Sequence, residues 1–390
     1  MSMADTTPDN LRVLHVMSSI DRRAGGPVAA LAGLARAQLA CGLRVSICAS
    51  FGAGDDLALA DELRRDGAEV HTVGPTGRFG RHPELAGTLA RLVGACDIVH
   101  IHALWEQIQH QAAAAARAAG VPYIFRPCGM LDPWSLAQSK WKKRLYMLLR
   151  LRRDLDRAAA LHFTSATEMD LTRPLNLRSP GIVEPNGVDL AEFESLPPRG
   201  AFRSRHPAIG ERPIVLFLSR VHPKKGLDLL IPAFARSALD DAVLVIAGPA
   251  EDNHDAAVRE MARRQGVADR VLLVGMLKGR DRVEALVDAE LFTLPSYQEN
   301  FGVAVVEALA AGLPVLISDQ VNIHREISAA RVGGVVPAQV QPLADELRRW
   351  MRDTSLRRAA AERARPFVRE HYDWRMIAAR WAGRYRQLIA

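Results

Sequence analysis

Short apolar runs with strand character alternate with helical patterns along the whole chain. They lie at residues 12–18, 44–50, 97–102, 122–126 and 160–165 in the first half, and at residues 214–219, 243–248, 271–275, 290–296 and 314–318 in the second. Alternation of this kind is typical of parallel sheets whose strands are joined by crossover helices. The sequence therefore predicts an α/β protein with two parallel sheets.

Residues 195–213 separate the two series of strands. They are rich in proline, glycine and arginine and have no hydrophobic periodicity, so we expect the linker between two domains there. A chain of 390 residues is long enough for two domains with cores of their own. We expect the first domain to span residues 1–200 and the second to span residues 201–371.

The composition is that of an ordinary globular protein, with 48% hydrophobic and 24% charged residues. No apolar run reaches the roughly 18 residues of a membrane span, and the first ten residues lack the basic and apolar regions of a targeting signal. We therefore expect a cytoplasmic location. The four cysteines form no C-x-x-C pair, so we expect reduced thiols without a metal or disulfide site.

The net charge of +7 is concentrated in residues 140–157, and this concentration argues against a nucleic-acid partner. The basic residues of the segment are Lys140, Lys142, Lys143, Arg144, Arg150, Arg152, Arg153 and Arg157, and its apolar residues near helical spacing are Trp141, Leu145, Leu148, Leu149 and Leu155. Basic amphipathic helices lie on anionic membrane surfaces. Two interpretations stay open: a peripheral contact with the cytoplasmic face of a membrane, or a domain helix with a solvated basic face.

Two basic residues follow the first strand of the second series. Arg220 and Lys225 precede a helix that begins near Leu227. Ligands of parallel α/β sheets bind at the carboxyl ends of the strands. There a guanidinium, an ammonium and the N–H groups of a helix end would together clamp a diphosphate. Either residue alone is more simply a solvated loop charge.

The stretch QENFGVAVVE, residues 298–307, places two glutamates around a helix start. Phe301, Gly302 and Val303 offer first-turn amides that attract a phosphate. Glu299 lies before these amides and Glu307 about two turns further on, a spacing that suits the hexose and the ribose of a nucleotide diphosphate sugar. Alternatively, Glu307 is a buried acid neutralised by an arginine, and Glu299 is an ordinary acid at a helix N-terminus.

The loops of the first half carry weaker signals. Gly25 and Gly26 permit a close backbone approach to a ligand before a helix that Pro27 begins. His100 and His102 share one face of a strand, but no third ligand follows at a usual spacing, so we expect no metal there. The segment RPCGMLDPWSL offers polar groups and an aromatic platform that suit a sugar acceptor: Arg126, Cys128, Gly129, Asp132 and Trp134. Trp134 is alternatively a core residue.

With these motifs the chain resembles the glycosyltransferases of family 4, which have the GT-B fold of two Rossmann-like domains facing a central cleft. The resemblance covers Leu11 to about Trp374. It rests on the residues already named and on the segment PNGVD at residues 185–189. It implies a nucleotide-sugar-binding second domain, an acceptor-binding first domain, and a last helix at residues 372–390 that crosses back to the first domain.

The same resemblance implies a function. Retaining transfer of a hexose from a nucleotide diphosphate sugar is expected, with Arg220, Lys225 and Glu299 at the reacting centre and no metal or other cofactor. The residues expected to bind the donor are Gly25, Gly26, Gly275, Met276, Leu277, Asn300, Phe301, Gly302, Val303 and Glu307. The GMLDPW segment resembles the branch that builds bacterial exopolysaccharide or lipopolysaccharide on glycan or lipid-linked acceptors.

One residue departs from the family pattern. Many members have His-Gly where this chain has Cys128-Gly129, and a thiol replaces a histidine hydrogen bond poorly. We therefore expect no general base at this position, and we expect the departing phosphate oxygen to take the acceptor's proton. His102 is a candidate substitute contact to the acceptor.

Two other functions fit part of the pattern. A nucleotide-sugar epimerase of the same fold would use the same diphosphate cradle, but it would need acid and base residues near the hexose. A non-enzymatic protein that binds membrane surfaces would depend on residues 140–157 alone and would leave the cradle unexplained.

Overall fold

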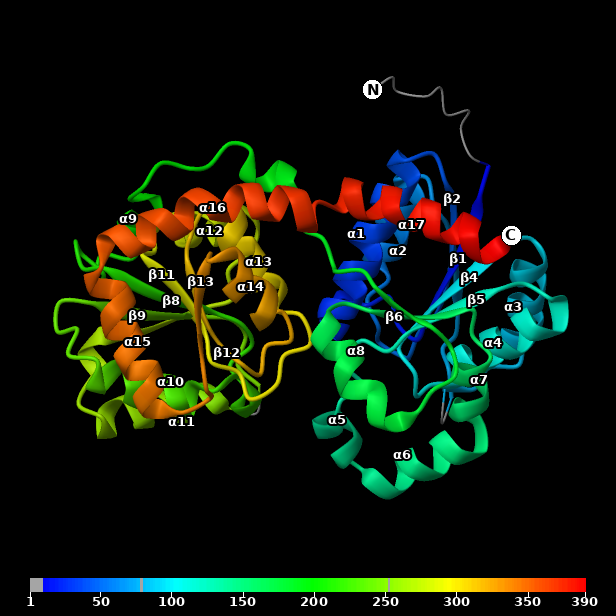
Figure 1. Cartoon of the computed structure of the whole chain (residues 1–390), viewed down its shortest axis with the longest axis horizontal. Coiled ribbons are helices and arrows are strands. Elements are labelled where there is room, and N and C mark those ends of the chain that lie inside the picture. The colour runs from blue at the N-terminus through cyan, green and yellow to red at the C-terminus, as the bar shows by residue number, and fades with distance from the viewer. Residues whose placement is uncertain (1–9, 78–79, 252) are drawn as a thin grey trace. The chain divides into compact units, whose positions relative to one another are not determined.

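The computed structural model describes residues 10–77, 80–251 and 253–390, and it divides into two compact units. Unit 1 contains the chain up to Gly187 together with Trp374–Ala390, and unit 2 contains Val188–Asp373 (Figure 1). The expectation that the chain begins without a targeting signal falls mainly on residues 1–9, which lie outside the described residues.

Unit 1 is built on a seven-stranded parallel sheet in the order β3-β2-β1-β4-β5-β6-β7. Its strands are β1 (Arg12–Met17), β2 (Arg44–Ser50), β3 (Glu69–Val73), β4 (Ile98–His102), β5 (Tyr123–Arg126), β6 (Ala160–Phe163) and β7 (Gly181–Val183). Its helices are α1 (Gly26–Ala40), α2 (Ala58–Arg65), α3 (Leu85–Gly94), α4 (Gln107–Ala119), α5 (Pro133–Ala137), α6 (Lys140–Tyr146), α7 (Arg152–Asp156), α8 (Ala166–Thr172) and α17 (Trp374–Ile389).

Unit 2 repeats this plan with a six-stranded parallel sheet in the order β10-β9-β8-β11-β12-β13. Its strands are β8 (Ile214–Leu218), β9 (Val243–Ala247), β10 (Val271–Gly275), β11 (Leu291–Leu294), β12 (Val315–Ser318) and β13 (Gly333–Val336). Its helices are α9 (Ala201–Arg205), α10 (Leu227–Arg236), α11 (His254–Arg264), α12 (Gly279–Asp288), α13 (Val303–Ala310), α14 (His324–Ala330), α15 (Val340–Arg352) and α16 (Thr354–Tyr372).

Each sheet has one point where the strand order reverses direction. In unit 1 the point lies between β1 and β4, and in unit 2 it lies between β8 and β11. At such a point the loops after the two neighbouring strands diverge to opposite faces of the sheet and leave room for a ligand. The loops after these four strands are therefore the first places to look for a binding site.

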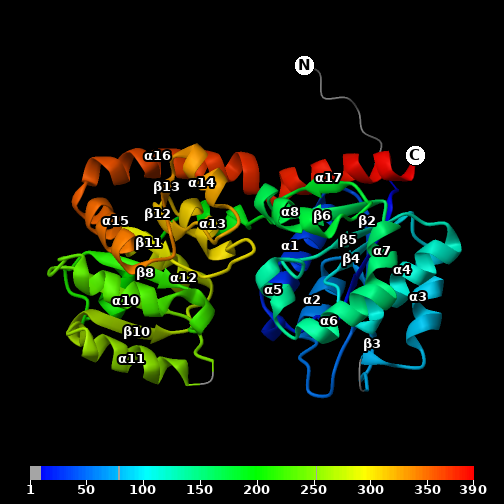
Figure 2. The same cartoon turned by 60° about the horizontal axis from the view of Figure 1, so that its bottom comes forward.

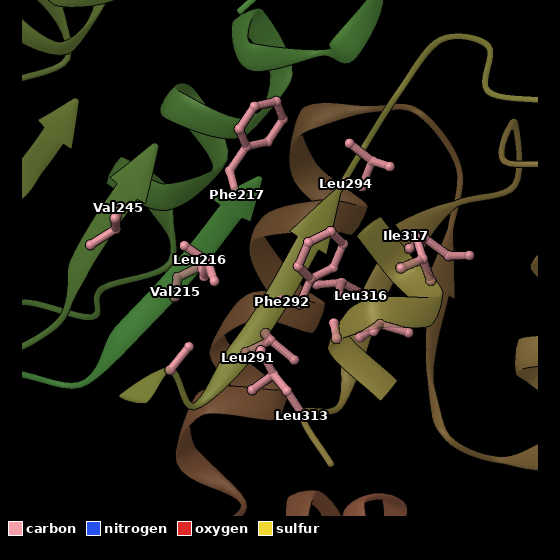
Figure 3. Packing of buried hydrophobic residues seen from close by; sticks show 14 of the residues in the cluster. Val215, Leu216, Phe217, Val245, Leu291, Phe292, Leu294, Leu313, Leu316 and Ile317 are labelled. Atoms are coloured by element: carbon pink, nitrogen blue, oxygen red, sulfur yellow. The ribbon is translucent and has the colours of Figure 1, made fainter. Parts of the chain in front are cut away.

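The central strands are buried on both faces. In unit 2, every residue of β9, β11 and β12 is buried, and so are all but the last residue of β8. Figure 3 shows how Leu216 of β8, Phe292 of β11 and Leu316 of β12 pack in one cluster. Burial on both faces explains why these strands are continuous apolar runs in the sequence.

The sequence prediction missed three strands, β3, β7 and β13. All three are edge strands of their sheets. An edge strand is partly exposed and needs no continuous apolar run, and the sequences EVHTV, GIV and GGVV have none of useful length.

The predicted domain boundary is wrong. The chain passes from unit 1 to unit 2 at Gly187 and Val188, not at residues 200 and 201. The expected linker, residues 195–213, lies within unit 2, where Phe202 and Ile209 are buried in the core. Its composition reflects irregular packing around Arg203, which donates hydrogen bonds to the carbonyl oxygens of Gly210 and Arg212.

The last helix, α17, belongs to unit 1 by its contacts and lies along α1. Its first residue, Trp374, rests on Gly33 of α1, where an added Cβ would lie 2.4 Å from the indole Nε1. Trp381 and Tyr385 are fully buried against the sheet. The helix therefore completes the core of unit 1 with residues from the far end of the sequence.

The basic segment forms α6, a π-helical turn (Met147–Leu151) and α7 in direct succession, and Figure 2 shows α6 on the outside of unit 1. The prediction of one apolar face that includes Leu155 is wrong, because Leu155 is buried in the core. A π-turn adds one residue per turn and rotates the following helix relative to the preceding one. The other four apolar residues stay exposed: Trp141, Leu145, Leu148 and Leu149.

Among the described residues, no helix is both long and apolar enough to cross a membrane.

Candidate functional site

A buried ion pair lies at the switch point of unit 2. Lys225, in the loop after β8, donates a hydrogen bond from Nζ to Oε2 of Glu299, in the loop after β11. The exposed fractions of the two side chains are only 8% and 19%. Burial alone would raise the pKa of Glu299, but the charge and hydrogen bond of Lys225, the charge of Lys224 and the Phe301 amide together outweigh it, so the pKa is lowered on balance. The two sequence motifs therefore meet as one charged centre.

Close backbone packing holds the two loops together. Gly226 has a φ of 72°, and a Cβ at this position would lie 2.1 Å from the carbonyl oxygen of Pro295. The amide of Tyr297 donates to the carbonyl oxygen of Lys224 at 2.9 Å. Only glycine fits such an approach at a positive φ, so Gly226 lets the Lys225 loop rest on the chain that follows β11.

The helix α13 begins beside this ion pair. Gly302 precedes it with a φ of 78°, and Val303 is its first residue. The Phe301 amide donates to the Glu299 carboxylate, so this amide is already engaged and the expectation that it binds a donor phosphate needs a rearrangement. The Phe301 side chain is buried in the core, whereas Asn300 accepts a hydrogen bond from the side chain of Asn322 at 3.3 Å.

Arg220 lies after the same strand as Lys225 but is paired elsewhere. Its Nη1 contacts Oε1 of Glu251 at 2.5 Å, and 55% of the arginine side chain is exposed. Exposed ion pairs contribute about 0–1 kcal/mol, so a competing anion can displace Glu251 at little cost. The partner Glu251 was not recognisable from the sequence because it follows a different strand, β9.

Glu307 is paired with an arginine, as one of the two interpretations predicted. Oε1 of Glu307 lies 3.1 Å from Nη1 of Arg282 on α12, and 13% of the glutamate side chain is exposed. Burial raises the pKa of Glu307 to about 7 even though Arg282 acts in the opposite direction. The carboxyl group is thus poised between its neutral and charged forms near neutral pH.

Three of the expected donor-binding residues lie at the end of β10. Gly275 ends the strand with a φ of 74°, and its carbonyl oxygen accepts a hydrogen bond from the Gly248 amide at 2.7 Å. Met276 is 60% exposed and Leu277 is half-buried. The role of these residues in donor binding stays a prediction.

In unit 1, the glycine loop after β1 is held by a buried aspartate. The Asp21 carboxylate accepts the amides of Arg23 at 2.8 Å and of Asp56 at 2.9 Å. Gly25 has a φ of 85° and caps α1, whose first residue is Gly26. Asp21 thus ties the loop to the one that follows β2, and it was missed because its partner in that second loop, Asp56, is distant in the sequence.

The ends of β4 and β5 bring two candidate acceptor residues together. His102 and Arg126 are direct partners in the register of the two strands, and both are buried. Nη2 of Arg126 donates to Oδ1 of Asn186. Among the described residues, no carboxylate hydrogen-bonds to Arg126, which leaves a buried cation without an anionic partner.

The segment after β5 is a strained turn anchored by an acid. Cys128 and Gly129 have φ values of 55° and 75°, and the Gly129 amide donates to Oε1 of Glu168 at 2.6 Å. Glu168 also accepts two hydrogen bonds from Thr164 at 2.7 Å, one from its amide and one from its hydroxyl. Burial raises the pKa of the Cys128 thiol, so the thiol is neutral and is not a base. Sequence reasoning missed Glu168.

The remaining candidates of this segment differ in exposure. Asp132 is buried and precedes α5, whereas 44% of Trp134 is exposed. Because Trp134 is exposed, it is not a core residue, and its indole can contact a sugar.

A third histidine, His15 of β1, lies beside His100 and His102, although its spacing in the sequence did not indicate this. One ligand atom from each of the three side chains lies within 4.8 Å of the others.

Comparisons with known proteins agree with this architecture. The family model "Glycosyl transferase 4-like domain" matches residues 25–187, and the model "Glycosyl transferases group 1" matches residues 199–367. The solved structure of HepE from Anabaena, in complex with UDP, is similar with a TM-score of 0.79 and 18% identity over 97% of this chain and all of that one. WaaG, described as a glycosyltransferase involved in lipopolysaccharide biosynthesis, has a TM-score of 0.66 and 20% identity over 95% of this chain and 98% of that one.

Two curated relatives are more similar in sequence. A phosphatidyl-myo-inositol mannosyltransferase of Mycobacterium leprae is 31% identical over 210 residues, which is 52% of each chain. An alpha-D-kanosaminyltransferase of Streptomyces kanamyceticus is 26% identical over 334 residues, which is 84% of this chain and 79% of the relative. The chain thus spans about half the length of the first of these relatives.

Two Rossmann-like parallel-sheet domains, each with polar loops at its switch point, define the GT-B class of fold. Together the two family models leave few residues between Gly25 and Phe367 unmatched. The chain belongs to the family 4 glycosyltransferases, as the resemblance predicted.

Loss of one partner of the ion pair should destabilise unit 2 more than loss of both. We expect Lys225→Met to lower the free energy of unfolding by about 3–5 kcal/mol, since it leaves the Glu299 carboxylate buried and unpaired. Addition of Glu299→Gln should recover most of this loss. Urea denaturation of the wild type, both single variants and the double variant measures the coupling, and equal stabilities of Lys225→Met and the double variant would contradict it.

Proposed function

We propose that this protein is a retaining glycosyltransferase that moves a hexose from a nucleotide diphosphate sugar to a glycan or lipid-linked acceptor, in the assembly of bacterial exopolysaccharide or lipopolysaccharide. The observation that carries the proposal is the buried Lys225–Glu299 pair at the switch point of unit 2. A buried ammonium beside a helix start suits a diphosphate, and an acid next to it suits the hydroxyl groups of a sugar.

The donor would displace the ion pairs that are now present. Arg220 would leave the exposed Glu251 and, with Lys225, stabilise the charge that grows on the β-phosphate, helped by the amides of Gly302 and Val303. Glu299, released from Lys225, would accept from hexose hydroxyls, and Glu307 from ribose hydroxyls. Because these cations supply the compensating charge, no metal is needed in this scheme.

The proposed base pocket uses Gly275, Met276 and Leu277. HepE from Anabaena was solved with UDP and with UDP-glucose, whereas a related mannosyltransferase of Mycobacterium tuberculosis is described as GDP-mannose-dependent. Both uridine and guanosine donors are therefore reasonable for this chain. A thermal-shift panel of UDP-, GDP- and ADP-sugars identifies the donor, because a ligand that binds only the folded state raises the melting temperature.

The acceptor half of the reaction is assigned to unit 1. We propose that the acceptor binds to His102, Arg126, Cys128, Gly129, Asp132 and Trp134. The neutral thiol of Cys128 gives no general base. In this scheme the departing phosphate oxygen takes the proton of the acceptor hydroxyl, on the same face of the sugar that it leaves, and the anomeric configuration is retained.

The basic segment supports a peripheral contact with the cytoplasmic face of a membrane. Trp141 and Leu148 are 80% and 77% exposed, amid lysines and arginines on α6 and the π-turn that follows it. An exposed apolar group next to basic residues suits the boundary between acyl chains and anionic headgroups. This contact would bring the enzyme to a lipid-linked acceptor at the membrane surface, while the rest of the protein would stay in the cytoplasm.

A transfer assay tests the function. Purified protein is incubated with a labelled UDP- or GDP-sugar, with and without a lipid-linked glycan extract of bacterial membranes. We expect label to enter the extract with retained anomeric configuration, and Lys225→Gln to reduce this at least a hundredfold because it removes charge from the leaving group. Arg236→Ala, at the exposed far end of α10, is the control that keeps activity. Conversion of the donor without the extract would instead identify an epimerase.

Donor binding should depend on the ionisation of Glu307. Its pKa is about 7, and only the charged carboxylate accepts well from both ribose hydroxyls. We expect the affinity for the nucleotide sugar to rise roughly tenfold from pH 6 to pH 8 as the group ionises, and the rise to be absent in Glu307→Gln. Calorimetric titration with an intact nucleotide sugar, whose diphosphate does not titrate in this range, measures it.

The raised pKa of Glu307 also predicts how the free energy of unfolding depends on pH, and this prediction does not depend on the proposed function. The folded-state pKa is raised above the usual value of 4.5, so the unfolded chain releases the proton at lower pH than the folded chain does. The contribution to stability is therefore present below pH 4.5 and is lost as pH rises through 7. If Glu307→Gln left both pH dependences unchanged, the assignment of Glu307 would be wrong.

The exposed apolar residues of the basic segment should control membrane binding. Replacement of Trp141, Leu148 and Leu149 by serine should reduce binding to phosphatidylglycerol vesicles at least tenfold, because about 2 kcal/mol of transfer free energy is lost per large side chain. Met376→Ser, which changes an exposed apolar residue of α17, is the matched control. Sedimentation with vesicles measures binding, and equal binding of the triple variant and the control would exclude this surface.

A further inference from the structure

A chain of buried polar side chains runs through unit 1 to the end of β4. It joins four histidines of the central strands to one side chain each from α1 and α17, and all six are at most 2% exposed. In order, the contacts are Glu184 O to His162 Nε2 at 2.8 Å, His162 Nδ1 to His100 Nε2 at 3.1 Å, His100 Nδ1 to Tyr385 OH at 2.8 Å, Tyr385 OH to Gln38 Nε2 at 3.0 Å, Gln38 Oε1 to His15 Nε2 at 2.7 Å, and His15 Nδ1 to His102 Nε2 at 2.9 Å. We call this chain the histidine relay.

The histidines of the relay are neutral. Burial lowers the pKa of His15 to about 4 and holds the pKa of His100 and of His102 well below the usual value. The pKa of His162 is lowered for the same reason. The guanidinium of Arg126 also disfavours a positive charge on each ring. A neutral imidazole has one N–H and one lone pair, so each ring passes on the direction of the hydrogen bond that it receives.

One carbonyl oxygen sets the direction of the first half of the relay. The Glu184 carbonyl can only accept, so His162 carries its proton on Nε2 and accepts on Nδ1. His100 must then donate from Nε2 and accept on Nδ1, and its donor on that nitrogen, among the described residues, is the hydroxyl of Tyr385.

The second half of the relay follows in the same way. Because the Tyr385 proton is committed to His100, its oxygen accepts from the amide nitrogen of Gln38. Gln38 therefore presents its oxygen to His15, which donates from Nε2 and accepts on Nδ1. His102 must donate from Nε2 to His15, and its Nδ1 is left with a lone pair.

The lone pair on Nδ1 of His102 is near a hydrogen-bond donor, the guanidinium of Arg126. Nδ1 of His102 and Nε of Arg126 are both buried, and neither has a hydrogen-bond partner within the described part of the chain. The two residues are paired across β4 and β5, and the guanidinium of Arg126 is near enough to lower the pKa of His102 by its charge, so an acceptor and a charged donor are carried by neighbouring residues. A hydroxyl group matches both, since its proton can go to Nδ1 and its oxygen can accept from Nε–H. An oxyanion would be repelled by the lone pair.

A metal ion would not fit the same residues as well. It would require a lone pair from each of His15, His100 and His102. The relay engages both ring nitrogens of His15 and of His100 in hydrogen bonds. A divalent ion would also lie near the uncompensated charge of Arg126, and for these two reasons the polar chain favours hydrogen bonding over coordination.

We propose that His102 and Arg126 form a subsite for a hydroxyl group of the acceptor, and that the histidine relay holds His102 in the Nε2–H tautomer so that Nδ1 always accepts. Gln38 and Tyr385 are positioning residues in this scheme. The identification of the hydroxyl with the acceptor substrate rests on the proposed function, whereas the tautomer does not.

Nitrogen NMR of the imidazole rings tests the tautomer. In the wild type at pH 7, His102 should show a protonated Nε2 and an unprotonated Nδ1, with the signals assigned from His102→Gln. In Gln38→Met, His15 loses the acceptor for its Nε2–H, and in Tyr385→Phe the Gln38 amide can turn over. Both variants should therefore show a mixture of His102 tautomers. Tyr123→Phe, which removes a buried hydroxyl outside the relay, should leave the wild-type pattern.

The NMR results distinguish the relay from its alternatives. A protonated Nδ1 or a charged ring in wild-type His102, or an unchanged tautomer in both relay variants, would overturn the relay. One equivalent of zinc in the purified protein, with ring signals that change on chelation, would replace it by a metal site. None of these measurements needs glycosyl transfer, so they stand even if the proposed function fails.

The transfer assay tests the subsite. With the lipid-linked glycan extract as acceptor, Gln38→Met should raise the extract concentration for half-maximal transfer about tenfold and leave the half-maximal donor concentration unchanged. Tyr123→Phe should change neither. If the relay variants show mixed tautomers but an unaltered dependence on the extract, the position holds an internal water only and the subsite proposal is wrong.

Discussion

The pairing of β8 with β11 controls the candidate site of unit 2. These strands are more than 70 residues apart in sequence, yet they are neighbours in the sheet because β9 and β10 are wound to one side and β12 and β13 to the other. Parallel winding places the carboxyl ends of all strands at one edge, and the reversal of order leaves space there. Lys225 and Glu299 can form a buried ion pair only because the loops after these two strands converge at that edge.

The two units stabilise their buried polar side chains in different ways. Unit 2 uses opposite charges, so the charged side chains of its candidate site are held in ion pairs. Unit 1 uses neutral rings in a directed chain of hydrogen bonds, which leaves one unmatched acceptor and one unmatched cation at the end of β4 and β5. Unmatched buried polar groups are costly, and in unit 1 this cost falls at the edge of the sheet where ligands of this class of fold bind.

The sequence was informative where a residue acts through its own neighbours in the chain. Central strands such as IVLFLS were predicted because burial on both faces demands a continuous apolar run. The glycine and glutamate motifs around α13 were found because a helix start has a local signature. The edge strand β13, the partners Arg282 and Glu168, and the true crossing at Gly187 had no such signature. The linker at residues 195–213 was misjudged because loop composition does not distinguish a connection between domains from an irregular segment packed inside one.

The sequence by itself determined the α/β class, the division into two sheets and the chemical character of each loop, since these depend on hydrophobic period and residue type over short distances. Tertiary structure decided which loops meet, which carboxylates are paired and how each histidine is protonated. His15, Gln38, His102 and Tyr385 come from four separate segments and join one relay only after β1, β4, α1 and α17 have packed. Proton positions and charge states depend on distances of about 3 Å, and only the packed fold brings such distant residues that close.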